Sequence, residues 1–168
     1  MEMKRLKILF RIIIFIYIIT LTDIFISGTF YHLSRLLEEK SSHKALGYAQ
    51  LSIKLNPINS SNYLQKYRVL RIILKSKLSS DEKQRYIKET LKTLKKAIEL
   101  EPVNPSYHMY YALALLKYKE KRPAVIELIK SELIKAKQLK PYSPLYQKIA
   151  NTYIKVLSAH FKEEGSVS

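Results

Sequence analysis

The sequence predicts an all-α protein in which an apolar N-terminal transmembrane helix precedes an α-solenoid, a stack of about three helical hairpins. Three observations support this fold class. A long apolar run lies near the N-terminus, a proline-centred turn recurs three times, and apolar and small residues on either side of each turn repeat at helical spacing. No alternating pattern typical of a strand competes with these signals.

The apolar run begins behind a short basic tail. Four lysines and arginines between positions 4 and 11 precede eight consecutive apolar residues, 12–19, and apolar character continues to Phe30. A helix needs about 20 mostly apolar residues to cross the hydrocarbon of a bilayer, and the run supplies that length. We therefore expect a basic tail and transmembrane anchor over residues 1–30 and a juxtamembrane helical linker over 31–41.

Two other interpretations of the run remain open. A cleaved secretory signal begins in the same way, but residues 23–28 place bulky side chains where a signal peptidase prefers small ones. A core helix of a soluble fold would need a solvated face, which eight consecutive apolar residues do not provide. The positive-inside tendency keeps a short basic tail in the cytoplasm. We therefore expect a single-pass protein of the inner (cytoplasmic) membrane whose repeat domain is extracytoplasmic.

The recurring turn is centred on Pro57, Pro102 and Pro141. A leucine stands two residues before each proline, and a tyrosine follows five or six residues after it. Proline ends a helix, and the Asn or Ser two residues later can cap the next one, so each turn is expected to join two antiparallel helices. The expected helices after the anchor cover residues 42–55, 60–77, 81–100, 105–119, 123–139 and 144–161.

A small residue stands five positions before each of the three prolines, where it allows two helices to approach closely. These residues are Ser52, Ala97 and Ala136. Together with the leucines and tyrosines of the turns, they make residues 42–161 resemble the tetratricopeptide repeat (TPR) family. The sequence departs from the family in lacking the first-helix tryptophan and in a proline spacing wider than the family's repeat of about 34 residues. The resemblance implies a TPR-like repeat domain over 42–162, and the polar residues 163–168 are expected to form a disordered tail.

The sequence offers no arrangement typical of an active site. Its three glycines are far apart, which excludes glycine-rich phosphate-binding loops. It has no cysteine, and its four histidines have no second ligand at the helical spacing that metal sites use. Adjacent glutamates such as Glu38 and Glu39 point in different directions and do not form an acid/base pair. We expect no catalytic residues, no cofactor and no metal.

The TPR resemblance implies that the first helix of each hairpin lines a concave face, on which such domains hold extended peptides or partner helices. The residues implied for this partner-binding groove are Leu64, Arg68, Arg71, Ile72, Met109, Leu113, Leu116, Lys148, Thr152 and Lys155. Such a groove is apolar in its middle and basic at both ends. Because arginine binds a carboxylate through two parallel hydrogen bonds, an acidic or extended peptide is the expected ligand. The alternative is an ordinary solvated basic face, and the asparagines of the family's carboxylate-clamp subtype do not occur at these positions.

The 30 lysines and arginines outnumber the 14 acidic residues, which gives a net charge of +16. This charge favours acidic proteins, anionic lipid or nucleic acid as partners, although a lysine-rich composition alone also produces it. The leading hypothesis is a non-enzymatic, membrane-anchored scaffold or adaptor that recruits or braces a partner of a cell-envelope complex. The alternatives are a small accessory subunit of a larger integral-membrane assembly and a basic binder of anionic lipid or nucleic acid. Nucleic acid is less expected, because helical periodicity assigns the aromatic residues to the core.

Overall fold

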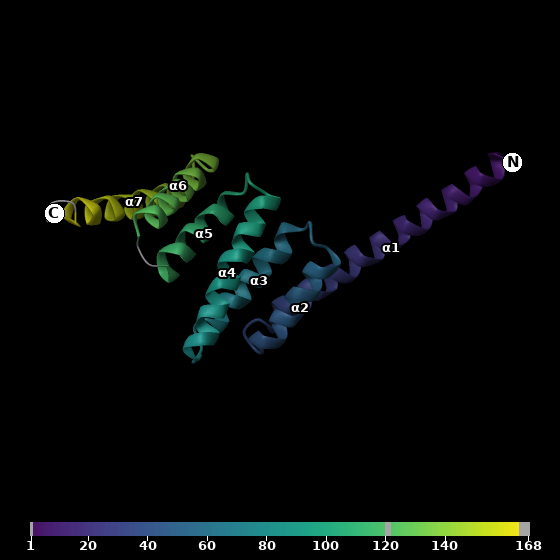
Figure 1. The fold of residues 1–168 in the computed structure, drawn as a ribbon, viewed down its shortest axis with the longest axis horizontal. Helices are drawn as coiled ribbons and strands as arrows, with labels where there is room; N and C mark the ends of the chain where they lie inside the picture. Colours follow the sequence, from purple (N-terminus) through teal and green to yellow (C-terminus); the bar gives the residue numbers. More distant parts are fainter. Residues whose placement is uncertain (1, 120–121, 165–168) are drawn as a thin grey trace. The chain divides into compact units, whose positions relative to one another are not determined.

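The computed structural model describes residues 2–119 and 122–164, and within these ranges every regular element is an α-helix (Figure 1). The helices are α1 (Glu2–Leu37), α2 (Ser42–Leu55), α3 (Ser60–Ile73), α4 (Ser80–Leu100), α5 (Pro105–Tyr118), α6 (Pro123–Leu139) and α7 (Pro144–Glu164). The chain forms two compact units, which we call the N-terminal unit (Met1–Ser76, with α1–α3) and the C-terminal unit (Lys77–Ser168, with α4–α7). The predicted all-α class is confirmed.

The helix starts follow from capping chemistry close by in the sequence. The side chain of Asn59 accepts a hydrogen bond from the backbone N–H of Ser61 at 3.0 Å, and Asn104 accepts one from Ser106 at 3.1 Å. These bonds satisfy N–H groups that the first turn of a helix leaves without an internal partner. Because such signals are local, α3 and α5 begin at the predicted residues, Ser60 and Pro105. α2 and α6, which have no side-chain cap, also begin and end at the predicted residues.

The start of α4 and the end of α5 each differ from the prediction by one residue, and the ends of α3 and α7 differ by more. α3 ends at Ile73 rather than near residue 77, because its last carbonyls are taken by tight turns: the backbone N–H of Lys75 donates to the Ile72 carbonyl at 3.0 Å, and the Ser76 hydroxyl donates to the Ile73 carbonyl at 2.7 Å. At the other end of the chain, α7 continues to Glu164, so the first two residues of the predicted disordered tail are helical. Residues 165–168 of that tail lie outside the described residues.

The small residues predicted to face neighbouring helices are buried in both units. In the N-terminal unit, Ala45 and Ala49 of α2 are 0% exposed. In the C-terminal unit, the same is true of Ala97 on α4, Ala112 on α5 and Ala136 on α6. Side chains of this size let helix axes come close, so larger neighbours such as Leu70, Leu94 and Leu133 fill the remaining core.

The long helix α1 has two halves with different surroundings. Between Leu6 and Ile26 its large hydrophobic side chains are all exposed, and in Figure 1 this half extends well past α2 and α3. Among the described residues, α1 is the one helix that is long and apolar enough to cross a membrane by length and composition. From Ser27 onward the helix packs against α2 and α3.

The second half of α1 forms the first helical hairpin together with α2. The Ser34 hydroxyl donates to the Ala45 carbonyl and the Ser27 hydroxyl to the Ser52 carbonyl, both at 2.9 Å, and the rings of Phe30 and Tyr48 stack with centroids 5.8 Å apart. Residues predicted as a linker over 31–41 therefore include a packed stretch of α1. The hairpin starts before Ser42, the first residue assigned to the repeats from sequence.

Candidate functional site

A buried polar seam joins α1 to α2 and α3 in the N-terminal unit. The amide group of Asn62, 1% exposed, donates to the Ser27 hydroxyl at 3.1 Å, to the Ser52 carbonyl at 3.1 Å and to the Asn56 carbonyl at 3.2 Å. An amide nitrogen buried in an apolar core is costly without partners, so these bonds favour one register of the three helices.

Gln65 extends the same seam one turn further along α3. Its amide nitrogen donates to the Glu38 carboxylate at 2.8 Å and to the Ser34 hydroxyl at 3.3 Å, while its buried oxygen has no hydrogen-bond partner in the described part of the chain. Both amides therefore hold the packed half of α1 against α3.

Four residues of the predicted groove lie on α3. Their spacing places Leu64, Arg68, Arg71 and Ile72 along one face of the helix. Arg71 is exposed, with its guanidinium 6.0 Å from the centroid of the Tyr67 ring, and the other three are half-buried. The two arginines make this face basic, and its part in a partner-binding groove stays a prediction.

The other six predicted groove residues lie in the C-terminal unit. On α5, Leu113 and Leu116 are half-buried, whereas Met109 is 4% exposed and belongs to the core. On α7, the three polar residues are exposed; they are Lys148, Thr152 and Lys155. The ten residues are thus divided between the two units, and their meeting in a single groove stays a prediction.

The structure adds a cleft that sequence reasoning missed, bounded by α4, α5 and α6 within the C-terminal unit. We call it the basic cleft; its volume is about 750 Å³. Its cations come from α4 and from the two residues that flank the α5–α6 turn, and they are Lys88, Lys92, Lys95, Lys119 and Arg122. Its apolar lining consists of Ile87, Leu91, Leu115, Val125 and Leu128. Among the described residues that line it, none carries a carboxylate.

The basic cleft is suited to a ligand that is both acidic and apolar. Lys88, Lys92 and Lys95 are spaced by four and three residues, so they share the exposed face of α4. An anionic ligand group can approach these cations while its apolar part covers the leucines beneath them. The lysine spacing was visible in the sequence, but the cleft depends on three helices meeting and has no local signal.

Tyr111 on α5 is one of the residues that line the basic cleft. Burial raises the pKa of its phenol above the ordinary value, and the negative charge of Glu132 raises this pKa further.

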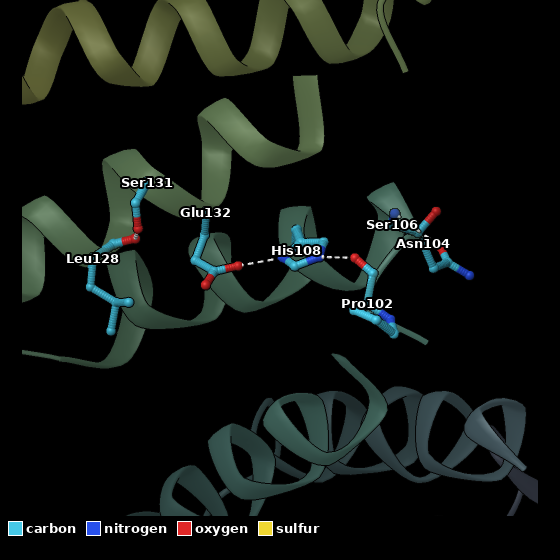
Figure 2. A network of polar contacts seen from close by, with 7 residues as sticks. All are labelled: Pro102, Asn104, Ser106, His108, Leu128, Ser131 and Glu132. Carbon is cyan, nitrogen blue, oxygen red and sulfur yellow. Dashed lines mark hydrogen bonds and ion pairs between the residues drawn. The ribbon is translucent and has the colours of Figure 1, made fainter. Parts of the chain in front are cut away.

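Behind this wall, His108 connects three elements of the C-terminal unit (Figure 2). The imidazole is 0% exposed; its Nε2 lies 2.8 Å from the Pro102 carbonyl oxygen in the α4–α5 turn, and its Nδ1 lies 2.6 Å from a carboxylate oxygen of Glu132 on α6. The imidazole thus links the α4–α5 turn to α6 through α5. Sequence reasoning treated His108 as isolated because Glu132 is distant along the chain.

The fold, rather than the sequence, relates this chain to known proteins. No protein-family profile and no curated protein matches the sequence. Among solved structures, the TPR domain of Arabidopsis OM64 is similar with a TM-score of 0.62 at 15% identity, covering 82% of this chain and 98% of that one. The Yersinia enterocolitica type III secretion chaperone SycD, in complex with a peptide of the translocator YopD, gives 0.61 at 12% identity, covering 79% and 92%. PcrH, in complex with the chaperone-binding region of PopD, gives 0.59 at 12% identity, covering 79% and 91%.

These similarities define the class of fold. The chain is an all-helical protein of TPR-like fold with one long apolar N-terminal helix, as the turn motif and the small-residue positions predicted.

Proposed function

We propose that this protein is a non-enzymatic, membrane-anchored adaptor that holds an acidic segment of a partner protein. The observation that supports this best is the basic cleft: five cations surround an apolar lining within a TPR-like fold. A segment that carries glutamates or aspartates beside leucine-like side chains complements both properties. We keep the predicted groove as a second candidate surface for an acidic segment.

The proposed anchor is the first half of α1. Its exposed apolar side chains from Leu6 to Ile26 cover about 30 Å at 1.5 Å per residue, which matches the hydrocarbon thickness of a bilayer. The preceding lysines and arginines favour a cytoplasmic N-terminus. We therefore propose a single-pass protein of the inner membrane with an extracytoplasmic repeat domain. Tethering an adaptor in this way raises the local concentration of the partner that it holds, as expected for a component of a cell-envelope complex.

Two of the similar structures lend support from their ligands. SycD was solved with a peptide of YopD and PcrH with a binding region of PopD, so folds of this shape hold segments of other proteins. We propose that this chain also holds a segment of another protein. Its partner would be recognised by acidic and apolar side chains.

The proposal is tested with the full chain in lipid nanodiscs and a fluorescent amphipathic peptide that carries glutamates on one face and leucines on the other. The triple variant Lys88→Glu, Lys92→Glu, Lys95→Glu is expected to weaken binding about tenfold or more, because three charge pairs are lost and replaced by repulsion. The matched control Arg68→Glu, Arg71→Glu, Lys155→Glu makes the same change in net charge on the predicted groove.

The comparison of the two triple variants locates the ligand. Loss in the first variant alone places the peptide in the basic cleft, and loss in the second alone places it in the predicted groove. Unchanged binding in both variants contradicts the adaptor proposal. Tight, steeply salt-dependent binding of DNA in place of peptide would favour the nucleic-acid alternative instead.

A further inference from the structure

The hydrogen bonds between α1 and α2 fix how far along α1 the next turn lies. Ser34 bonds to Ala45 and Ser27 bonds to Ser52, so the two helices run antiparallel in one constant register. Continuing this register places Leu55, the last residue of α2, opposite Ile24. The turn between α2 and α3, residues 56–59, consequently lies level with the part of α1 around Asp23.

This α2–α3 turn is held rigidly at that level. Asn62 donates both to the Asn56 carbonyl in the turn and to the Ser27 hydroxyl on α1. The Tyr63 hydroxyl donates to the Pro57 carbonyl at 3.0 Å, which ties the tip of the turn to α3. With these bonds in place, the turn cannot swing away from α1 without breaking buried polar contacts.

The tip of the turn is apolar and open. Ile58 is 79% exposed, and Leu51 on the last turns of α2 is 42% exposed. Lys54, also exposed, lies between them in the sequence. An isoleucine at the tip of a tight turn, beside a lysine, has the composition of a segment that enters the boundary between headgroups and acyl chains.

The depth of the turn follows from the proposed membrane span, on which this step rests. If Leu6 to Ile26 fills the hydrocarbon, Asp23 lies within about one helical turn of its outer boundary. The α2–α3 turn shares that level, so it meets the lipid of the outer leaflet beside the helix. We infer that this turn is a second membrane contact: Ile58 inserts into the interfacial layer and Lys54 reaches the lipid headgroups, holding the first hairpin against the bilayer.

The absence of cysteine from the chain allows single labels to test this contact. The full chain is placed in nanodiscs with a spin label at Ile58→Cys, at Phe15→Cys in the middle of the proposed span, or at Leu36→Cys. Leu36 is 71% exposed and lies about 20 Å further along α1 than Asp23. Because all three positions are exposed, the labels do not disturb packing. The readout is collision with oxygen, which concentrates in lipid, against collision with a water-soluble nickel complex.

The labels at Phe15→Cys and Ile58→Cys are expected to favour oxygen several-fold over the nickel complex, and the label at Leu36→Cys is expected to favour the nickel complex. A lipid-shielded label at Phe15→Cys with a water-exposed label at Ile58→Cys would overturn the second contact and leave the anchor standing. Water exposure at both positions would overturn the proposed anchor itself.

Discussion

His108 shows how one buried side chain fixes the geometry around it. A carbonyl oxygen only accepts hydrogen bonds, so the Nε2 atom that faces Pro102 must carry a hydrogen and donate it. The contact between Nδ1 and Glu132 at 2.6 Å ties the other side of the same ring to α6. Since the imidazole is fully buried, its nitrogen atoms can bond to water instead only if the C-terminal unit unfolds locally.

We predict that His108→Leu and Glu132→Leu each destabilise the protein by about 2 to 4 kcal/mol, because each leaves one partner of a buried pair unsatisfied. The double variant is expected to cost clearly less than the sum of the two, since both partners are then removed together. Denaturant unfolding of the full chain in detergent, followed by circular dichroism, measures the cycle. Ser131→Ala on the exposed face of α6 is the control and is expected to change stability by about 0.5 kcal/mol or less. Strict additivity would contradict the coupling.

Tyr111 makes the stability of the C-terminal unit sensitive to alkaline pH. Its pKa in the folded state is raised by burial and by Glu132, so the folded protein holds this proton more tightly than the unfolded chain does. The resulting stability is fully present below the ordinary tyrosine pKa of about 10 and is lost as the pH rises through the raised value. The free energy of unfolding of Tyr111→Phe should therefore fall less between pH 9 and pH 11 than that of the unchanged protein. Equal slopes would show that Tyr111 has no part in this pH dependence.

At the scale of the helices, the local signals were sufficient for most of the fold. The turns at Pro57 and Pro102 combine a helix stop, a cap and a helix start within a few residues. At the Pro141 turn α6 likewise ends and α7 begins within five residues. The early end of α3 also has a local cause, since the hydroxyl of Ser76 takes a carbonyl at the end of the helix. The sequence does not indicate whether this hydrogen bond or a further turn of helix is the more stable.

The surroundings of α1 were less predictable because the helix has an exposed apolar half and a packed half. Its apolar composition dominates the pattern, so the residues beyond the span were interpreted as a linker. The relevant signal was weaker: Ser27 and Ser34 stand seven residues apart and therefore on one face. Their bonds to α2 show that this face belongs to a packed hairpin. The exposed apolar half and the packed half of α1 consequently form one continuous helix.

The candidate sites divide in the same way between local and distant causes. Lysines at 88, 92 and 95 share a helix face by spacing alone, but the basic cleft forms only because α5 packs against both α4 and α6. The contact between His108 and Glu132 likewise depends on how α5 and α6 pack, which spacing within one helix cannot indicate. That the exposed residues of the predicted groove bind a partner stays a proposal. Met109, which was predicted to line this groove, is buried in the core.

At the scale of the whole molecule, the net charge of +16 and the apolar lining of the cleft have separable effects. Charge acts at a distance and attracts any polyanion, so it raises association rates without selecting a partner. Apolar burial acts only on contact and requires a ligand of matching shape and composition. Selectivity for an acidic protein segment over DNA or anionic lipid must therefore come from the apolar part.

This difference predicts two distinct responses to salt. Binding of duplex DNA that neutralises six or more phosphates is expected to weaken by about 10³-fold or more between 50 and 200 mM salt, because affinity then depends on counterion release. Binding of the glutamate–leucine peptide should weaken far less over the same range, because burial of its leucines against Leu91 and Leu115 is not screened. Replacing the peptide's leucines by serines should give it a salt dependence set by charge alone and lower its affinity at every salt concentration. Fluorescence anisotropy with the full chain in nanodiscs measures all three ligands. Equal salt slopes for the leucine and serine peptides would mean that the apolar lining takes no part in binding.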